Sequence, residues 1–249
     1  MPAEDRFFSS CLLRLGDGHF LVDAGEPCIH SLRERGTVVR DIGAVLVTHG
    51  HVDHIGGIPA LLQGARLLGR TLPLPILLPG EMIAPLRAWI SALYLPEESL
   101  GFPVEWIPWR DGVPSDLGSG VTVIPRANGH LARSYPLLAG ADSSRACESF
   151  SLEVLGCGRR VLLSGDLSVA DELTPLVSAP ADVLVCELSH IDPAQLAGVL
   201  VDAGLGTLCL VHLSEDAAAE TASLRERMIT LLPKVSEVFV PTDGEMIDF

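Results

Sequence analysis

The feature that most constrains this chain is a group of histidines and an aspartate that directly follows a short apolar segment. Residues Ala44–Thr48 are apolar or β-branched, which predicts a buried strand, and residues Ile58–Leu68 have the spacing of a helix. Between the two, four polar side chains occur within six residues: His49, His51, Asp53 and His54. A loop between a buried strand and a helix is a favoured place for functional residues, because rigid elements on both sides hold it.

Imidazole and carboxylate groups together suit a zinc, iron or manganese ion. His49 and His51 are two residues apart, so an extended chain places both side chains on one side, where they can share an ion. Asp53 and His54 come where the chain turns into the predicted helix, and they can reach a second ion. The segment therefore predicts ligands for two cations rather than a solvated polar turn.

Three later residues can complete this site. His130, Asp166 and His212 each follow a predicted strand, and these strands are Val121–Pro125, Val161–Leu163 and Thr207–Val211. Side chains at the carboxyl ends of strands converge in layered α/β folds. The seven residues then divide into His49, His51 and His130 for one ion, Asp53, His54 and His212 for the other, and Asp166 as a bridge. Two divalent cations suit hydrolysis, because they activate water and polarise the group that is attacked.

Strand and helix patterns alternate along the chain, which indicates an α/β layered fold. A hairpin is predicted at Ser10–Leu15 and His19–Ala24, and helices are predicted at Asp171–Val177 and Asp216–Leu231. Hydrophobic residues make up 48% of the 249 residues, which is enough for a large core. No linker or repeat divides the sequence, so we expect one domain over residues 1–249.

The composition restricts the partners of the protein. Asp and Glu number 32 against 17 Lys and Arg, for a net charge of −15. Such a surface repels phosphate backbones, so long nucleic acid is not an expected partner. No apolar run reaches the roughly 18 residues of a membrane-spanning helix, and no export pattern is present, so we expect a cytoplasmic protein without membrane contact. The six cysteines are never spaced as C-x-x-C, which predicts reduced thiols.

The segment from Thr48 to His54 resembles the signature of the metallo-β-lactamase superfamily, and Asp23 in Leu-Val-Asp-Ala-Gly resembles its first motif. The similarity is closer to ribonuclease Z and related phosphodiesterases, in particular over Asp41–His49 and Asp53–Leu62. The resemblance implies a four-layer αβ/βα sandwich, with the metal site at one edge of the sheets. It also implies that the seven residues named above are metal ligands, that Asp23 supports the site, and that the protein forms a homodimer.

The chain departs from ribonuclease Z at three places. Leu155-Gly-Cys-Gly-Arg-Arg passes directly between two predicted strands and leaves no room for the family's tRNA-gripping arm. The family's histidine before a glutamate is replaced by Cys186, with His190 three residues after Glu187. The segment Cys186–His190 looks more like the cyclic-phosphate phosphodiesterase of the carbon–phosphorus lyase pathway, which implies His190 as a proton donor. The basic residues expected after the last ligand are replaced by Glu215 and Asp216.

Together these observations predict a dinuclear-metal hydrolase, namely a phosphodiesterase that acts on a small or short phosphodiester. Zinc is the expected metal, with manganese or iron as alternatives. Asp53 would also orient the attacking water, and Glu187 would orient His190. Arg133 and Ser134 could hold a phosphate. Three alternatives stay open: tRNA 3′ processing, hydrolysis of an ester, lactone or thioester on the same metals, and a non-catalytic scaffold.

Overall fold

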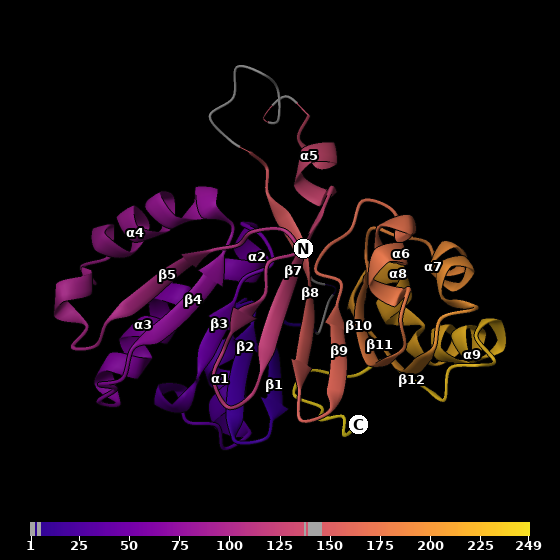
Figure 1. The fold of residues 1–249 in the computed structure, drawn as a ribbon, viewed down its shortest axis with the longest axis horizontal. Coiled ribbons are helices and arrows are strands. Elements are labelled where there is room, and N and C mark those ends of the chain that lie inside the picture. The colour runs from indigo at the N-terminus through magenta and orange to yellow at the C-terminus, as the bar shows by residue number, and fades with distance from the viewer. Residues whose placement is uncertain (1–2, 4–5, 137, 139–145) are drawn as a thin grey trace.

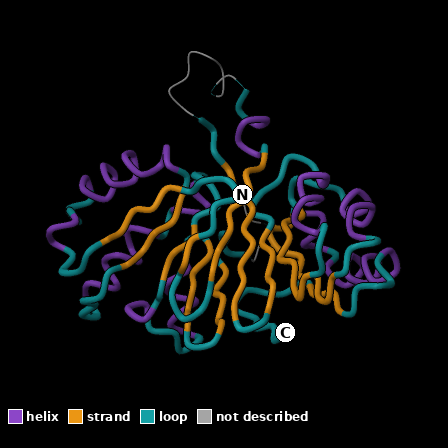
Figure 2. The backbone as a smooth tube through the Cα atoms, viewed as in Figure 1, coloured by secondary structure: helices purple, strands orange, loops and turns teal. Residues whose placement is uncertain are grey.

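Two β-sheets pack face to face in the computed structural model, which describes residues 3, 6–136, 138 and 146–249 (Figure 1). Helices cover the outer face of each sheet, as Figure 2 shows by the separation of helices and strands. The molecule thus has four layers in the order helix, sheet, sheet, helix. This confirms the predicted αβ/βα sandwich.

The first sheet has five strands in the order β1-β2-β3-β4-β5. β1 and β2 form the predicted antiparallel hairpin, with Leu13 opposite Phe20, and the other neighbouring strands are parallel. The strands are β1 (Cys11–Leu15), β2 (Gly18–Val22), β3 (Ala44–Leu46), β4 (Leu74–Leu78) and β5 (Val104–Pro108). The α-helices of this half are α1 (Cys28–Glu34), α2 (Val52–Ile55), α3 (Ile58–Leu67) and α4 (Ile83–Ala92), with short 3-10 helices at Val39–Asp41, Gly80–Met82 and Glu97–Ser99.

The second sheet has seven strands in the order β12-β11-β10-β9-β8-β7-β6. Pairing is antiparallel from β6 to β9 and parallel from β9 to β12. The strands are β6 (Ser115–Asp116), β7 (Thr122–Asn128), β8 (Ser149–Gly156), β9 (Arg159–Leu163), β10 (Ala181–Leu188), β11 (Leu205–Leu213) and β12 (Glu237–Phe239). The helices are α5 (His130–Ser134), a 3-10 helix at Ala170–Leu173, α6 (Thr174–Val177), α7 (Pro193–Leu200), α8 (Glu215–Ala219) and α9 (Thr221–Leu231).

The hydrophobic core has three parts, and β3 contributes to two of them, one on each face of its sheet. Val45 points to the outer face of its sheet and packs with Leu61 of α3, whereas Leu46 points inward to the space between the sheets. Alternate residues of a strand lie on opposite faces, so a strand covered on both sides is apolar throughout. Each fully buried aliphatic side chain contributes about 1.5–3 kcal/mol relative to exposure. This packing fixes the strand end from which the polar segment at residues 48–54 leaves.

Two predicted helices are wrong in detail. The helix predicted at Asp171–Val177 starts as a 3-10 helix and continues as α6. Pro175 lies in the first turn of α6 and has no amide hydrogen to continue an α-helical ladder from the preceding turn. The helix predicted at Asp216–Leu231 is broken at Glu220, whose ψ of 43° is not helical. The periodicity runs through both pieces, but α9 buries Leu224 and Met228, while α8 buries no residue.

The turn between β8 and β9 is short, as predicted. Gly156 pairs with Arg159, so two residues connect the strands, and both of them have positive φ angles. This hairpin has no space for an inserted arm.

Two predictions from composition can be compared with the structure. All six cysteines are free thiols, and four of them are buried. Within the described residues, no helix is long and apolar enough to cross a bilayer.

Candidate metal centre

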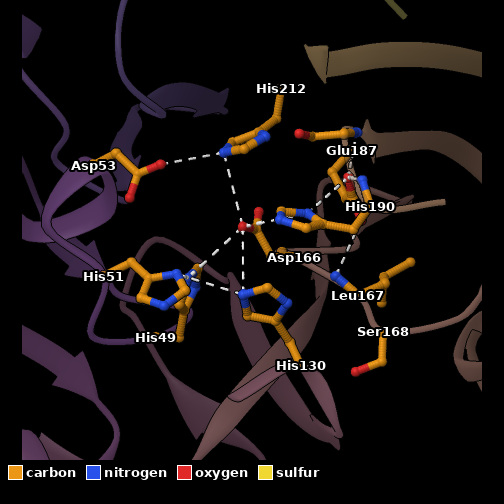
Figure 3. A network of polar contacts seen from close by, with 12 residues as sticks. His49, His51, Asp53, His130, Asp166, Leu167, Ser168, Glu187, His190 and His212 are labelled. Carbon is orange, nitrogen blue, oxygen red and sulfur yellow. Dashed lines mark hydrogen bonds and ion pairs between the residues drawn. The ribbon is translucent and has the colours of Figure 1, made fainter. Parts of the chain in front are cut away.

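The sequence-predicted ligands come together at one edge of the two sheets. Figure 3 labels all of them except His54. They arrive from both sheets. The loop after β3 and the start of α2 supply four of them, and His130 is the first residue of α5, directly after β7. Asp166 follows β9, and His212 lies near the end of β11. Residues up to 163 positions apart in the sequence thus face one another.

The first group contains His49, His51, His130 and Asp166, whose ligand atoms all lie within 4.8 Å of one another. His51 Nδ1 lies 2.9 Å from His49 Nε2 and 3.4 Å from His130 Nε2. Asp166 Oδ2 is 3.8 Å from His49 Nε2 and 3.7 Å from His130 Nε2. Nitrogen ligands about 2.0–2.1 Å from a tetrahedral zinc ion lie roughly 3.4 Å apart, so these spacings suit one ion.

The second group contains Asp53, His54 and His212, again within 4.8 Å. His212 Nε2 lies 3.3 Å from Asp53 Oδ2 and 3.7 Å from Asp166 Oδ2. The other oxygen of Asp166 lies 3.4 Å from His54 Nε2. The Asp166 carboxylate therefore lies between the two groups, where a bridging ligand would have to be.

Buried atoms without hydrogen-bond partners support a cation at this place. Among the described residues, His54 Nε2 and Asp166 Oδ2 are buried and have no such partner. A buried polar atom without a partner costs about 1–3 kcal/mol, and a metal ion would remove that cost. The donor set of imidazole nitrogens and carboxylate oxygens is also the one that zinc and manganese take. The residues present thus fit divalent cations.

The pKa values favour the protonation states that metal ligands need. Burial lowers the pKa of His49 well below its ordinary value, and burial likewise lowers the pKa values of His51 and His130, so these rings are neutral. Burial disfavours the charged form of Asp53, but the hydrogen bond from His212 and the charge of His54 together outweigh it and lower the Asp53 pKa to about 2. Neutral imidazoles and ionised carboxylates are the forms that bind metal.

His54 differs from the other histidines because two carboxylates hold it. Burial lowers its pKa, but the charges of Asp23 and Asp166 outweigh burial and raise the pKa to about 10. The same contact acts on Asp166: burial raises the Asp166 pKa, but the close approach and charge of His54, with the charges of His212 and His49, hold it well below its ordinary value. His54 and Asp166 are therefore an ion pair when no cation separates them.

Asp23 is not in either ligand group, but it contacts His54 and Thr48 beside the site. Its Oδ2 accepts hydrogen bonds from His54 Nδ1 at 2.8 Å and from the Thr48 hydroxyl at 2.9 Å. Its Oδ1 accepts from the Thr48 backbone N–H at 2.8 Å. A carboxylate on one ring nitrogen fixes the orientation of the imidazole, so that the other nitrogen faces the metal. Thr48 is a contributor that the sequence reasoning did not identify.

Local backbone geometry also shapes the site. Asp23 has a φ of 56° and His212 a φ of 46°, in the left-handed region that residues other than glycine seldom adopt. The pairing of β10 with β11 shifts register between Glu187 and Leu188, as at a β-bulge. Bulges near active sites re-aim side chains, and this one lies directly before the segment that carries His190.

His190 lies at the rim of the cluster, with 36% of its side chain exposed. Its Nδ1 is 3.3 Å from Glu187 Oε2 and 3.7 Å from Asp166 Oδ2. Glu187 is buried, and its carboxylate also accepts from the backbone N–H groups of Leu167, Ser189 and His190. The hydrogen bond to Glu187 raises the pKa of His190 above its ordinary value.

The two predicted phosphate-binding residues lie on α5, further from the histidines. Arg133 Nη1 is 3.9 Å from Glu172 Oε1, and both Arg133 and Ser134 are exposed. The neighbouring Tyr135 places its ring against His51, at 5.7 Å between centroids. Asn128 is a further residue that the sequence reasoning did not identify. Its side-chain oxygen accepts from the His130 backbone N–H at 3.2 Å and from the Ser149 hydroxyl.

Comparison with known proteins identifies the family. A family model described as a β-lactamase superfamily domain matches residues 19–226. Ribonuclease Z from Pseudomonas putida is 31% identical over 256 residues, which cover 80% of this chain and 76% of that protein. The chain belongs to the metallo-β-lactamase superfamily, in its ribonuclease Z-like branch. This confirms the family predicted from the motifs, and with it a metal-dependent hydrolase that uses divalent ions.

Solved structures show the same fold. The metallo-β-lactamase fold protein YhfI from Bacillus subtilis has a TM-score of 0.73 at 21% identity, covering 98% of this chain and 92% of that chain. Human tRNase Z, short form, has a TM-score of 0.71 at 21% identity, covering 99% and 94%. At these identities the likeness concerns the fold alone.

Proposed function

We propose that this protein is a dinuclear, zinc-dependent phosphodiesterase that acts on a small or short phosphodiester. One observation carries the proposal: two groups of convergent histidines and carboxylates meet at Asp166, which can bind an ion on each side. His49, His51 and His130 would hold one ion, and Asp53, His54 and His212 the other. When bound, two such ions activate water and offset charge on a phosphoryl group.

The chain itself would supply two further functions. The Asp53 carboxylate would orient the attacking water, in addition to its role as ligand. His190 would donate a proton to the departing alkoxide, since its ring lies beside the cluster and is partly exposed to incoming substrate. Glu187 would hold the His190 ring in place through the contact at 3.3 Å. Arg133 and Ser134 stay candidates for phosphate binding on the rim.

The size of the substrate is inferred from charge and from the β8–β9 hairpin. A net charge of −15 weakens the attraction of a long polyanion. The two-residue turn of the hairpin offers no arm that could hold a tRNA. These features favour a small substrate, although the relative from Pseudomonas putida is a ribonuclease Z. Zinc as the metal, two ions per chain, a homodimer and a cytoplasmic location are parts of the same proposal.

A substrate panel on zinc- and manganese-loaded protein tests the reaction. It should contain bis-p-nitrophenyl phosphate, 2′,3′-cyclic nucleotides, a tRNA precursor, a lactone and a thioester. We expect the highest kcat/KM with a small phosphodiester. A tRNA precursor cleaved at its 3′ side with higher kcat/KM than every small diester would replace the proposal by tRNA processing. Turnover of only the lactone or thioester would replace it by acyl hydrolysis.

The role of His190 can be tested separately with His190→Ala. A proton donor matters most for a leaving group of high pKa, so turnover of an alkyl diester should fall about 100-fold or more, and that of a p-nitrophenyl diester far less. Metal content should not change. His30→Ala is the matched control, because His30 is also an exposed histidine at 3.3 Å from a glutamate, but on α1. Equal losses with both substrates would exclude the proton-donor role.

A further inference from the structure

Glu172 lies where two ligand-bearing loops meet. It belongs to the 3-10 helix at Ala170–Leu173, and 13% of its side chain is exposed. Its Oε1 accepts a hydrogen bond from the backbone N–H of Gly129, and its Oε2 accepts one from the backbone N–H of Ser168, each at 2.9 Å. Each oxygen thus holds a different segment of the chain.

The two segments carry ligands of the first group. Gly129 directly precedes His130, and Ser168 comes two residues after Asp166. The contact between these ligands, 3.7 Å from His130 Nε2 to Asp166 Oδ2, joins loops that lie after β7 and after β9. β7 and β9 are not neighbours in the sheet, because β8 lies between them. The ladder of strand hydrogen bonds therefore does not join the two loops directly, whereas the Glu172 carboxylate does.

The absence of a side chain at Gly129 agrees with this contact. The backbone of Gly129 has φ −97° and ψ 8°, which other residues also adopt, so its conformation does not require glycine. A Cβ at this position would lie 2.7 Å from Glu172 Oε1. A side chain here would displace the carboxylate, because the carboxylate approaches the backbone closely. Arg133, at 3.9 Å from the same oxygen, adds a positive charge beside the carboxylate.

We infer that Glu172 is a positioning residue, which holds the His130 loop and the Asp166 loop at the separation that the first metal ion requires. Its two hydrogen bonds go to backbone N–H groups, so its effect reaches the ion only through the loops. Hydrogen bonds from amides to a carboxylate are stronger than those between neutral groups, which suits such a clamp. The inference rests on the proposed metal centre.

The substitution Glu172→Gln tests whether Glu172 positions the two loops. The variant keeps the shape but turns one acceptor oxygen into an NH₂ group, which faces an N–H and repels it. We expect zinc affinity to fall about tenfold or more for one of two ions, because changes in groups that orient ligands typically cost 10–100-fold. The affinity is measured by competition with a chromophoric chelator. The visible absorption of the cobalt-substituted protein should also change, since it reports the coordination geometry.

Asp182→Asn is the matched control. Asp182 also accepts from a backbone N–H, that of Arg160, and from an arginine, but at the opposite end of β9 and β10. The Asp182→Asn variant should leave zinc affinity and the cobalt spectrum unchanged.

The Gly129→Ala variant perturbs the contact between Gly129 and Glu172 from the other side. It should weaken zinc binding as well, and the double variant should lose less than the product of the two single losses.

The outcomes separate this inference from the proposal on which it rests. If the native protein binds two zinc ions and Glu172→Gln binds both with native affinity and an unchanged cobalt spectrum, the role of Glu172 is excluded. If Glu172→Gln does not fold, the Gly129→Ala variant decides instead: native zinc affinity in that variant also excludes the role of Glu172. If the native protein binds no divalent ion, the proposed metal centre fails, and this inference fails with it.

Discussion

Asp23→Asn provides a sharp test of how the second ligand group is held. The substitution preserves shape, and asparagine tolerates the left-handed backbone of this position better than most residues. It keeps an oxygen for the Thr48 backbone N–H, but it places an NH₂ group where Oδ2 now accepts from His54 and from the Thr48 hydroxyl. The hydroxyl can rotate and accept instead of donate. The charged ring of His54 donates from both nitrogens and cannot accept, so its Nδ1–H loses its acceptor.

The expected magnitude follows from that single loss. Hydrogen bonds to charged groups contribute about 1.5–3 kcal/mol, and Asp23 is buried, so water does not replace the lost contact. The free energy of unfolding of the metal-free protein should therefore fall by about 1.5–3 kcal/mol. Zinc affinity of the second group should fall about 10–100-fold, because the ring of His54 is no longer fixed.

Urea denaturation of the metal-free protein measures the first quantity, and chelator competition measures the second. Asp41→Asn is the control: Asp41 is half-exposed and contacts Arg40 on the surface, so its loss should cost less than about 0.5 kcal/mol. The reasoning is refuted if Asp23→Asn and Asp41→Asn are indistinguishable in both measurements.

Three further outcomes are expected. His51→Ala should remove most of the bound zinc and most activity, as measured by elemental analysis and turnover; native zinc content would exclude His51 as a ligand. Removal of metal by a chelator should lower the stability of the native protein, and zinc at about 1,000 times its Kd should restore about 4 kcal/mol; no change in the urea midpoint would contradict a structural ion. Asp192→Ala should cost about 0.5–2 kcal/mol, because Asp192 caps α7 by accepting from the backbone N–H of Ala194; an unchanged midpoint would contradict the cap.

The candidate ligands could be predicted from the sequence because each of them stands next to a recognisable strand. His49, Asp166 and His212 follow apolar runs that are buried in the structure, and the ends of those strands meet. The α/β class could be predicted for the same reason, since period and apolar runs depend on local residues. The order of the four layers was implied only by the resemblance to the family. Strand ends and motif spacing therefore indicated which residues gather at one edge, and the family motifs indicated the fold.

The residues that hold the site in place had no such local signal. Glu172 contacts Gly129 across 43 positions, and its own segment shows only a helical pattern. Asn128 stands beside His130, but its bond to Ser149 depends on the pairing of β7 with β8. The break at Glu220 also has no signal in the sequence, because the spacing of apolar residues continues across it. Such features depend on tertiary contacts.

The left-handed backbone at Asp23 and His212 has a consequence for protein engineering. A residue other than glycine in this conformation costs about 1–3 kcal/mol, and glycine would relieve it. A laboratory selection for thermal stability, carried out without added metal ions, would therefore favour glycine in place of His212. The proposed metal ligand at this position would then be lost. Selection for catalysis would act in the opposite direction at the same codon.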